Sequence, residues 1–163
     1  MVTVGDIGEF ALIEKIAAWV AADELAREPN PLLQLRLGIG DDAAVWAVPS
    51  GNLVSTIDTV VEGSHFLTGS TSWYDVGWRL MVSNLSDIAA MGAIPLCATI
   101  ALGIPSNLPV QSIEELYTGM LDACRPYQTH LVGGDVVGSS TTFVTASLNG
   151  VVSETPLSRA KAK

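Results

Sequence analysis

Basic residues are scarce in this chain. Its 163 residues include 8 Lys and Arg against 17 Asp and Glu, which gives a formal net charge of −9. Binding to a nucleic-acid backbone or to an anionic membrane surface needs clustered Lys and Arg, so we expect neither as a partner. An acidic protein can still bind phosphate groups where metal ions reverse the local sign of charge.

Cysteine is also scarce, and no segment has the composition of a leader or a membrane span. Cys97 and Cys124 have the spacing of neither a metal knuckle nor a redox pair, so we predict buried free thiols. The first residues lack a basic stretch followed by an apolar core, which favours the reducing cytoplasm. The uncharged stretch 88–104 is shorter than the roughly 20 residues of a spanning helix, and Gly92 and Pro95 interrupt it.

Several catalytic signatures are absent. The chain has no Walker P-loop and no readable Ser-His-Asp or Cys-His arrangement, and Gly38-Ile39-Gly40 is too short for a dinucleotide fingerprint. Hydrophobic residues make up 48% of the chain, so a single domain with its own core is expected. We place this domain at residues 1–155, and 156–163, which lacks an apolar pattern, reads as the start of a connection.

The hydrophobic periodicity predicts both helices and strands, in the order helix, two strands, helix, strand, helix, two strands. Apolar residues at helical spacing predict helices at 8–27, 73–91 and 112–127. Shorter apolar or alternating runs predict strands at 43–48, 53–58, 94–102, 130–132 and 141–152. The first two strands read as a hairpin, and Ser112 with Glu115 reads as a capping box. A mean hydropathy of +0.39 indicates apolar surface that meets a second subunit or domain.

Four acidic segments end apolar runs beside small residues. They are Gly40-Asp41-Asp42-Ala43, Thr56-Ile57-Asp58-Thr59, Asn84-Leu85-Ser86-Asp87 and Gly133-Gly134-Asp135. Carboxylates that a fold brings together repel one another unless a cation lies between them, and Lys and Arg are almost absent from these segments. Hard oxygen ligands without nearby His or Cys favour Mg²⁺. The sequence therefore predicts Mg²⁺ ions together with a bulky anion such as a nucleotide.

Each acidic segment also has a simpler interpretation. Asp41-Asp42 would form a polar turn, and Asp58 would be a strand-end carboxylate bonded to backbone N–H groups. Gly133-Gly134-Asp135 would be a plain turn in place of a phosphate cradle. Asp87 is the strongest candidate, because a lone Asp on an apolar helical face is costly unless it is paired or metal-bound. Asn84, three residues earlier, shares that face and is expected to orient Asp87.

Five motifs follow one another in the order of a known family. They are Gly8-Glu9-Phe10-Ala11-Leu12-Ile13, Gly38–Ala44, Asp58–Phe66, Asn84–Ala93 and Val132–Asp135. Together they resemble the N-terminal domain of the thiamine-monophosphate kinases, which belong to the aminoimidazole ribonucleotide synthetase superfamily of ATP-using enzymes. The resemblance implies an α/β fold, more specifically an α+β N-terminal domain with a mixed sheet packed with helices, and this sheet pairs with that of a second subunit to form a barrel. It also implies that 156–163 begins the linker to a C-terminal domain.

The resemblance further implies ATP- and Mg²⁺-dependent phosphorylation of thiamine monophosphate to thiamine diphosphate, by direct in-line transfer in a homodimer. Such a transfer needs positioning and charge neutralisation more than a nucleophile and a base. The metal ligands that it implies are Asp42, Thr56, Ile57 through its carbonyl, Asp58, Asp87 and Asp135. The implied ATP contacts are Tyr117, Gly134, Asp135 and Arg159, and His65 is the implied contact to thiamine monophosphate.

Two alternatives stay open at this point. One is another enzyme of the same superfamily, acting on a purine precursor, on a carbamoyl group in hydrogenase maturation, or on selenide. The other is a non-catalytic nucleotide-binding or dimerisation fragment. Because the resemblance places part of the acceptor site in the C-terminal domain, residues 1–163 alone are expected to make no thiamine diphosphate.

Overall fold

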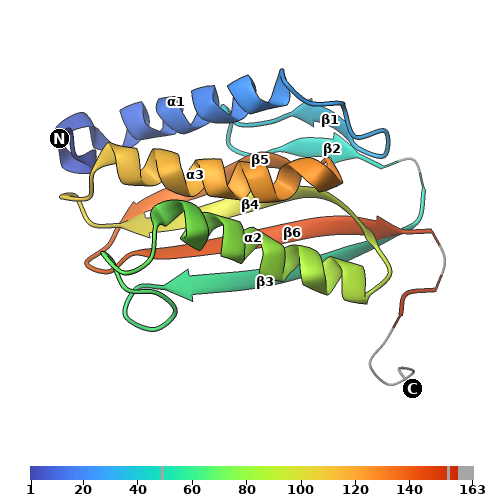
Figure 1. Ribbon diagram of the computed structural model, residues 1–163. Helices are drawn as coiled ribbons and strands as arrows, with labels where there is room; N and C mark the ends of the chain where they lie inside the picture. Colours follow the sequence, from blue (N-terminus) through green and yellow to red (C-terminus); the bar gives the residue numbers. More distant parts are fainter. Residues whose placement is uncertain (49, 154, 158–163) are drawn as a thin grey trace.

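The computed structural model describes residues 1–48, 50–153 and 155–157, and it shows helices packed on one face of a four-stranded sheet (Figure 1). The helices are α1 (Val4–Glu24), α2 (Trp73–Ala90) and α3 (Val110–Cys124), with the short 3₁₀ helix η1 (Arg125–Tyr127) after α3. The sheet consists of β3 (Asn52–Val61), β6 (Phe143–Val152), β4 (Ile94–Ile104) and β5 (His130–Gly138), in that order. A separate two-stranded sheet contains β1 (Gln34–Leu37) and β2 (Val45–Ala47).

The mixed sheet confirms the predicted fold class. β3 and β4 both run antiparallel to β6, whereas β4 and β5 run parallel. The parallel pair is connected through α3, as a parallel pair requires a crossover. Within the described part of the chain, β3 and β5 have a neighbour on one side only, so they form the two edges of the sheet.

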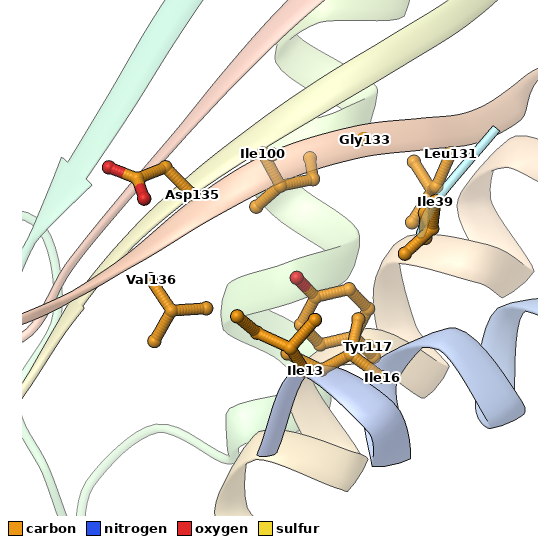
Figure 2. A pocket seen from close by; sticks show the side chains of 10 residues that line it. Ile13, Ile16, Ile39, Ile100, Tyr117, Leu131, Gly133, Asp135 and Val136 are labelled. Carbon is orange, nitrogen blue, oxygen red and sulfur yellow. The ribbon is translucent and has the colours of Figure 1, made fainter. Parts of the chain in front are cut away.

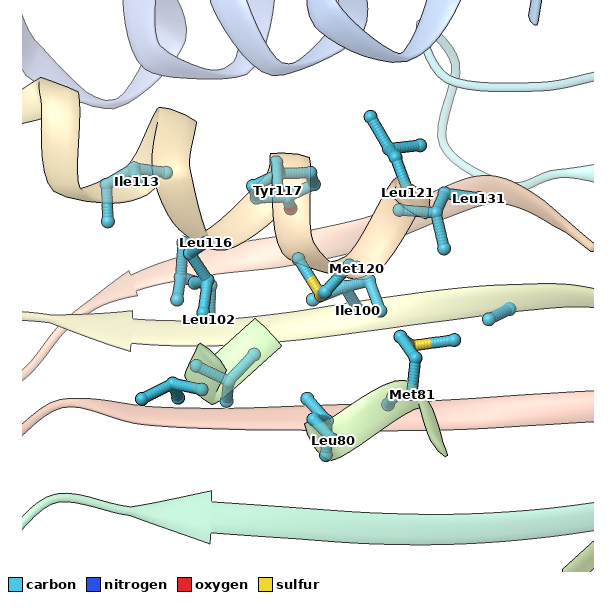
Figure 3. Close-up of a cluster of buried hydrophobic side chains, with 14 of the residues drawn as sticks. Leu80, Met81, Ile100, Leu102, Ile113, Leu116, Tyr117, Met120, Leu121 and Leu131 are labelled. Atoms are coloured by element: carbon cyan, nitrogen blue, oxygen red, sulfur yellow. The ribbon is translucent and has the colours of Figure 1, made fainter. Parts of the chain in front are cut away.

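The core lies between the helices and the sheet face that they cover (Figure 3). Its fully buried side chains come from α2, β4 and α3, and they include Leu80, Met81, Leu102, Leu116 and Met120. The opposite face of the sheet is covered at one end by the β1–β2 ribbon, which packs Leu35, Ala44 and Trp46 against Leu96, Cys97 and Val132. Elsewhere that face is open, and Leu53 and Ile57 of β3 are each 66% exposed.

Two glycines bring α2 and α3 into backbone contact. A Cβ atom added at Gly77 would lie 2.0 Å from the carbonyl oxygen of Leu116, and one added at Gly119 would lie 2.0 Å from that of Tyr74. Both distances are far shorter than a van der Waals contact, so only glycine fits at these positions. The two helices therefore touch directly, without an intervening layer of side chains.

Several local predictions are confirmed. α2 begins at the predicted residue, with the Ser72 side chain accepting a hydrogen bond from the Asp75 N–H. Cys97 and Cys124 are buried free thiols, and burial raises the pKa of each to about 12. None of the helices in the described ranges is long and apolar enough to cross a membrane.

Other local predictions are wrong. The strands at 43–48 and 53–58 do not form a hairpin, because β2 pairs with β1 and β3 pairs with β6. The predicted Ser112–Glu115 capping box is absent: α3 begins after Pro109, with no side-chain cap. A capping box forms instead between Thr3 and Asp6 at the start of α1, four residues before the predicted start.

Candidate functional site

One acidic group lies where the edge strand β3 faces α2. Thr56 and Asp58, two residues apart, point to the helix-covered side of the sheet, and the Thr56 hydroxyl donates to Asp87 Oδ2 at 3.0 Å. Burial, and after it the nearby charge of Asp87, raise the pKa of Asp58. Among the described residues no Lys, Arg or His forms an ion pair with either carboxylate. The two acids are thus held close together without a cation.

The expectation that Asp87 lies on an apolar face of its helix is wrong. Asp87 is exposed in the single chain, so its charge carries no burial penalty there. Asn84 is fully buried, and its Nδ2 donates to the Leu80 carbonyl at 3.0 Å, so the expected bond that would orient Asp87 is not made. Residues three apart on a helix diverge by about 60°, which is enough to turn Asn84 into the core and Asp87 toward the edge.

A pocket between α1, α3 and β5 contains the second group of candidates (Figure 2). Its walls are apolar, formed by Ile13, Ile16, Ile39, Ile100, Leu131 and Val136, and Gly133, Gly134 and Asp135 complete the lining. Tyr117 from α3 is only 4% exposed, with its ring 6.3 Å from that of Trp19 between centroids. Burial raises the pKa of this phenol, and the hydroxyl makes no hydrogen bond within the described residues.

The Gly133-Gly134-Asp135 segment is extended and lies inside β5, so it forms neither a turn nor a turn-shaped cradle. A Cβ atom at Gly134 would lie 2.0 Å from the carbonyl oxygen of Ile100, its partner on β4. The close pairing of the two strands therefore requires this glycine. Asp135 is exposed and belongs to the sheet face opposite the helices, and Figure 2 shows its carboxylate pointing away from the Tyr117 ring.

Asp41 and Asp42 lie in the turn before β2, beside a larger open hollow. The N–H of Asp42 donates to Asp41 Oδ1 at 2.8 Å, so Asp41 serves the turn. The hollow is lined by Asp42 together with Phe10 and Thr99, and it shares Ile13, Ile39, Gly133 and Gly134 with the Tyr117 pocket. Asp42 and Asp135 thus line two adjoining hollows at the β5 side of the sheet.

His65 lies in the loop after β3, away from both groups. It is exposed, its Nδ1 accepts a hydrogen bond from the Val61 N–H at 3.1 Å, and its carbonyl accepts one from Arg79 Nη1 at 3.0 Å. Together with Asp75, Trp78 and Arg79 it lines a separate hollow. No sequence pattern had pointed to Arg79, because its contact with residue 65 depends on how α2 packs.

The candidate metal ligands do not converge within one chain. Thr56, Asp58 and Asp87 are at the β3 edge, whereas Asp42 and Asp135 are at the β5 side, and β6 and β4 lie between. Neighbouring strands are about 4.8 Å apart, which separates the two edges by roughly 14 Å. In the described ranges, no three His, Cys, Asp or Glu side chains lie together so that they could hold a metal ion. Arg159, an expected ATP contact, lies outside the described residues.

The chemistry of the donors nevertheless fits Mg²⁺. The Asp58–Asp87 group offers only oxygen atoms, and its two carboxylates lie close enough for one to raise the pKa of the other. A divalent cation prefers such donors and removes their repulsion.

Comparison with known proteins identifies the class. Residues 40–152 match the family described as "AIR synthase related protein, N-terminal domain". This match covers more than half of the chain, and it includes every β-strand of the main sheet as well as both acidic groups. The chain therefore belongs to the family of AIR synthase related proteins, in which it corresponds to the N-terminal domain.

Individual proteins of known name that are similar to this chain include thiamine-monophosphate kinases. That of Synechococcus elongatus is 33% identical over 151 residues, which is 92% of this chain and 42% of the relative. A crystal structure of the enzyme from Stenotrophomonas maltophilia K279a is 35% identical, with a TM-score of 0.71, over 90% of this chain and 43% of that one. A structure described as AaThiL complexed with AMPPCP and TMP is 31% identical, with a TM-score of 0.67, over 100% and 48%. The chain thus spans less than half the length of these relatives.

Proposed function

We propose that this chain is the Mg²⁺- and ATP-binding part of a thiamine-monophosphate kinase, which transfers the γ-phosphoryl group of ATP directly to thiamine monophosphate. The observation that carries the proposal is the Asp58–Asp87 pair, two neighbouring carboxylates at a sheet edge without a basic partner in the described chain. An arrangement of this kind suits a reaction in which metal ions must neutralise two phosphate groups that repel each other.

Both acidic groups, one at the β3 edge and one at the β5 side, would bind Mg²⁺. Asp58, Asp87, the Thr56 hydroxyl and the Ile57 carbonyl would hold Mg²⁺ at the β3 edge, and Asp42 and Asp135 would do so at the β5 side. Bound Mg²⁺ would supply the positive charge that keeps the phosphates in line. Tyr117 and Gly134 line a pocket whose other walls are mostly aliphatic side chains, and such a lining suits a flat base. His65, and Arg159 beyond the described residues, would contact the acceptor and ATP respectively.

A homodimer would unite the two groups. β3 and β5 are the edges of the sheet, and an open sheet face with exposed Leu53 and Ile57 lies between them. When two such sheets close into a barrel around a two-fold axis that runs along the barrel, the β5 edge of one copy lies beside the β3 edge of the other. Asp135 of one copy and Asp58 of the second copy would then flank the same seam, Asp135 from the open face of the sheet and Asp58 from the helix-covered face, so a site at the seam would draw on residues of both copies.

Metal dependence tests the function. Isothermal titration calorimetry on this chain should detect ATP binding in Mg²⁺ or Mn²⁺ but not in EDTA. Asp87→Asn should weaken Mg²⁺-dependent binding by roughly tenfold or more, because an uncompensated loss of one charged ligand costs about 1.5–3 kcal/mol. Glu114→Gln, which removes an exposed carboxylate on α3, is the matched control. Equal ATP affinity in EDTA and in Mg²⁺ would contradict the proposal.

Mixing two defective variants tests the composite site. Asp58→Asn and Asp135→Asn should each abolish Mg²⁺-dependent ATP binding alone. After unfolding and refolding together, random pairing makes half of the dimers mixed, each with one intact site, so about a quarter of the sites should bind. A mixture of Asp58→Asn with Asp87→Asn should recover none, because both changes affect the same edge. No recovery in the first mixture would show that each site belongs to a single copy.

Turnover tests the division of labour between domains. Residues 1–163 should bind Mg·ATP and form no thiamine diphosphate, whereas a longer protein with a C-terminal domain from one of the relatives after residue 163 should form it. A substrate panel on that longer protein distinguishes thiamine monophosphate from a purine precursor, a carbamoyl compound or selenide.

A further inference from the structure

The loop that carries His65 is held at its start and in its middle by side chains to which the proposed function gives no role. It covers residues 62–71, between β3 and α2. At its start, the Glu62 carboxylate accepts hydrogen bonds from the Thr68 hydroxyl across the loop and from the Thr142 N–H at 3.4 Å. The bond from Thr68 is the largest cause that lowers the pKa of Glu62, as expected for a carboxylate whose charged form is held by donors. Glu62 thus closes the loop against the neighbouring strand.

Arg79 holds the middle of the same loop from α2. Its Nη1 donates to the His65 carbonyl at 3.0 Å, which fixes the backbone at the residue of interest. Next to it, Phe66 is buried, with its ring edge-on to Trp73 at 5.5 Å between centroids. Exposed loops are ordinarily more mobile than the elements that they connect. This loop is held by a guanidinium, a carboxylate and a buried aromatic ring, so we expect it to be more restrained than most.

The hydrogen bond to the His65 ring determines which nitrogen is free. The Val61 N–H donates to Nδ1 at 3.1 Å, so Nδ1 acts as an acceptor and carries no proton. In the neutral ring the proton is then on Nε2, which remains available as a donor. His65 shares its hollow with Trp78, Arg79 and Asp75, whose carboxylate accepts a hydrogen bond from the Ser72 hydroxyl at 2.6 Å, so this donor belongs to a depression with an aromatic wall and charges of both signs.

We propose that Arg79 and Glu62 are positioning residues that hold the 62–71 loop in the shape in which His65 offers an Nε2–H donor to an anionic oxygen of the acceptor substrate. A phosphate monoester such as thiamine monophosphate presents such an oxygen. The identity of the acceptor rests on the proposed function, whereas the state of the ring and the restraint of the loop are properties of this chain alone. The two parts are therefore tested separately.

Nitrogen-15 NMR of the histidine rings in this chain tests the first part. The wild-type His65 ring should show the pattern of a neutral ring protonated at Nε2, and His130, which faces Glu24, gives a reference signal from elsewhere in the chain. Arg79→Ala and Glu62→Ala should mix the two tautomers and should speed amide exchange at Gly63 and His65 by roughly tenfold. Arg79→Lys should restore most of the wild-type pattern. Arg36→Ala and Glu114→Ala, on β1 and the exposed face of α3, are the matched controls and should change nothing.

Kinetics of the longer protein test the second part. Arg79→Ala should raise the KM for thiamine monophosphate by about tenfold while the KM for ATP stays within about twofold, and Arg79→Lys should recover most of the loss. An Nδ1-protonated ring in the wild type, or a ring pattern unchanged in both alanine variants, would overturn the positioning role. Equal changes in both KM values would overturn the link to the acceptor. Failure of the wild type to bind Mg·ATP would overturn the proposed function instead, with the NMR result still deciding the role of Arg79 and Glu62.

Discussion

Replacing Gly134 by alanine should destabilise the domain far more than any other small change in β5. The added Cβ would lie 2.0 Å from the Ile100 carbonyl oxygen, whereas ordinary contact begins at 3.4 Å, so the strands must separate by the difference of 1.4 Å. β4 cannot recede, because its other side is bonded to β6. The shift must therefore come from β5, and it weakens the ladder bonds on both sides of residue 134.

The expected cost of this change is about 3 kcal/mol. Overpacking alone costs about 1–3 kcal/mol, and each weakened backbone hydrogen bond adds up to about 1 kcal/mol. For a domain of this size, that lowers the melting temperature by roughly 6–12 °C. Gly138→Ala is the matched control in the same strand, because a Cβ there has nothing within 4 Å. Thermal and urea unfolding, followed by circular dichroism, measure both. If Gly134→Ala and Gly138→Ala unfold alike, the close approach of the two strands does not constrain residue 134 and the steric argument is refuted.

Three further changes test other parts of the structure. Arg27→Ala removes a guanidinium that is 3% exposed, pairs with Asp23 and donates to the Thr129 carbonyl at 2.7 Å. Because Arg125 still pairs with Asp23, the change should cost about 1.5–3 kcal/mol in urea unfolding, with little effect from Arg36→Ala. Glu62→Gln should destabilise the chain at pH 7. The pKa of Glu62 is lowered in the folded chain, so the stability that its charge contributes is fully present above the ordinary pKa of 4.5. This contribution, and with it the difference between Glu62→Gln and the wild type, is lost as the pH falls through the pKa of the folded state. A pH-independent difference would contradict this. In EDTA at pH 7, Asp58→Asn should have a higher melting temperature than the wild type, because burial and Asp87 disfavour the charged carboxylate. Added Mg²⁺ should give the wild type the higher melting temperature. If Asp58→Asn melts higher in both buffers, the metal assignment is refuted.

Local signals predicted the elements that local interactions define. α2 was placed to within a residue at each end by the helical spacing of its apolar residues, and in the structure Ser72 caps its start. β1 was missed, since the short segment Gln34–Leu37 has no strong pattern and is fixed only by its partner β2. β5 was cut short at residue 132, because two adjacent glycines read as a turn when the close approach of Ile100 cannot be seen.

The candidate site shows the same limit. Composition and spacing identified the acidic residues, and the structure places Asp58 next to Asp87. The separation of Asp42 and Asp135 from that pair depends on the strand order β3-β6-β4-β5, which pairs segments far apart in the chain. The exposure of Asp87 and the inward turn of Asn84 also could not be predicted, because periodicity shows which residues share a side but not how the helix is rotated against the sheet.

The glycine contact between α2 and α3 has a mechanical consequence. Side chains between helices normally act as a compliant layer that lets one helix slide past the other by changing rotamers, and at Gly77 and Gly119 no such layer exists. α2 carries Asp87 and α3 carries Tyr117, so a push on either helix is transmitted through backbone to the other. An ion that draws Asp87 toward β3 would consequently also tilt the wall of the Tyr117 pocket. The spacing between α2 and α3 would stay constant, because the two helices would move together.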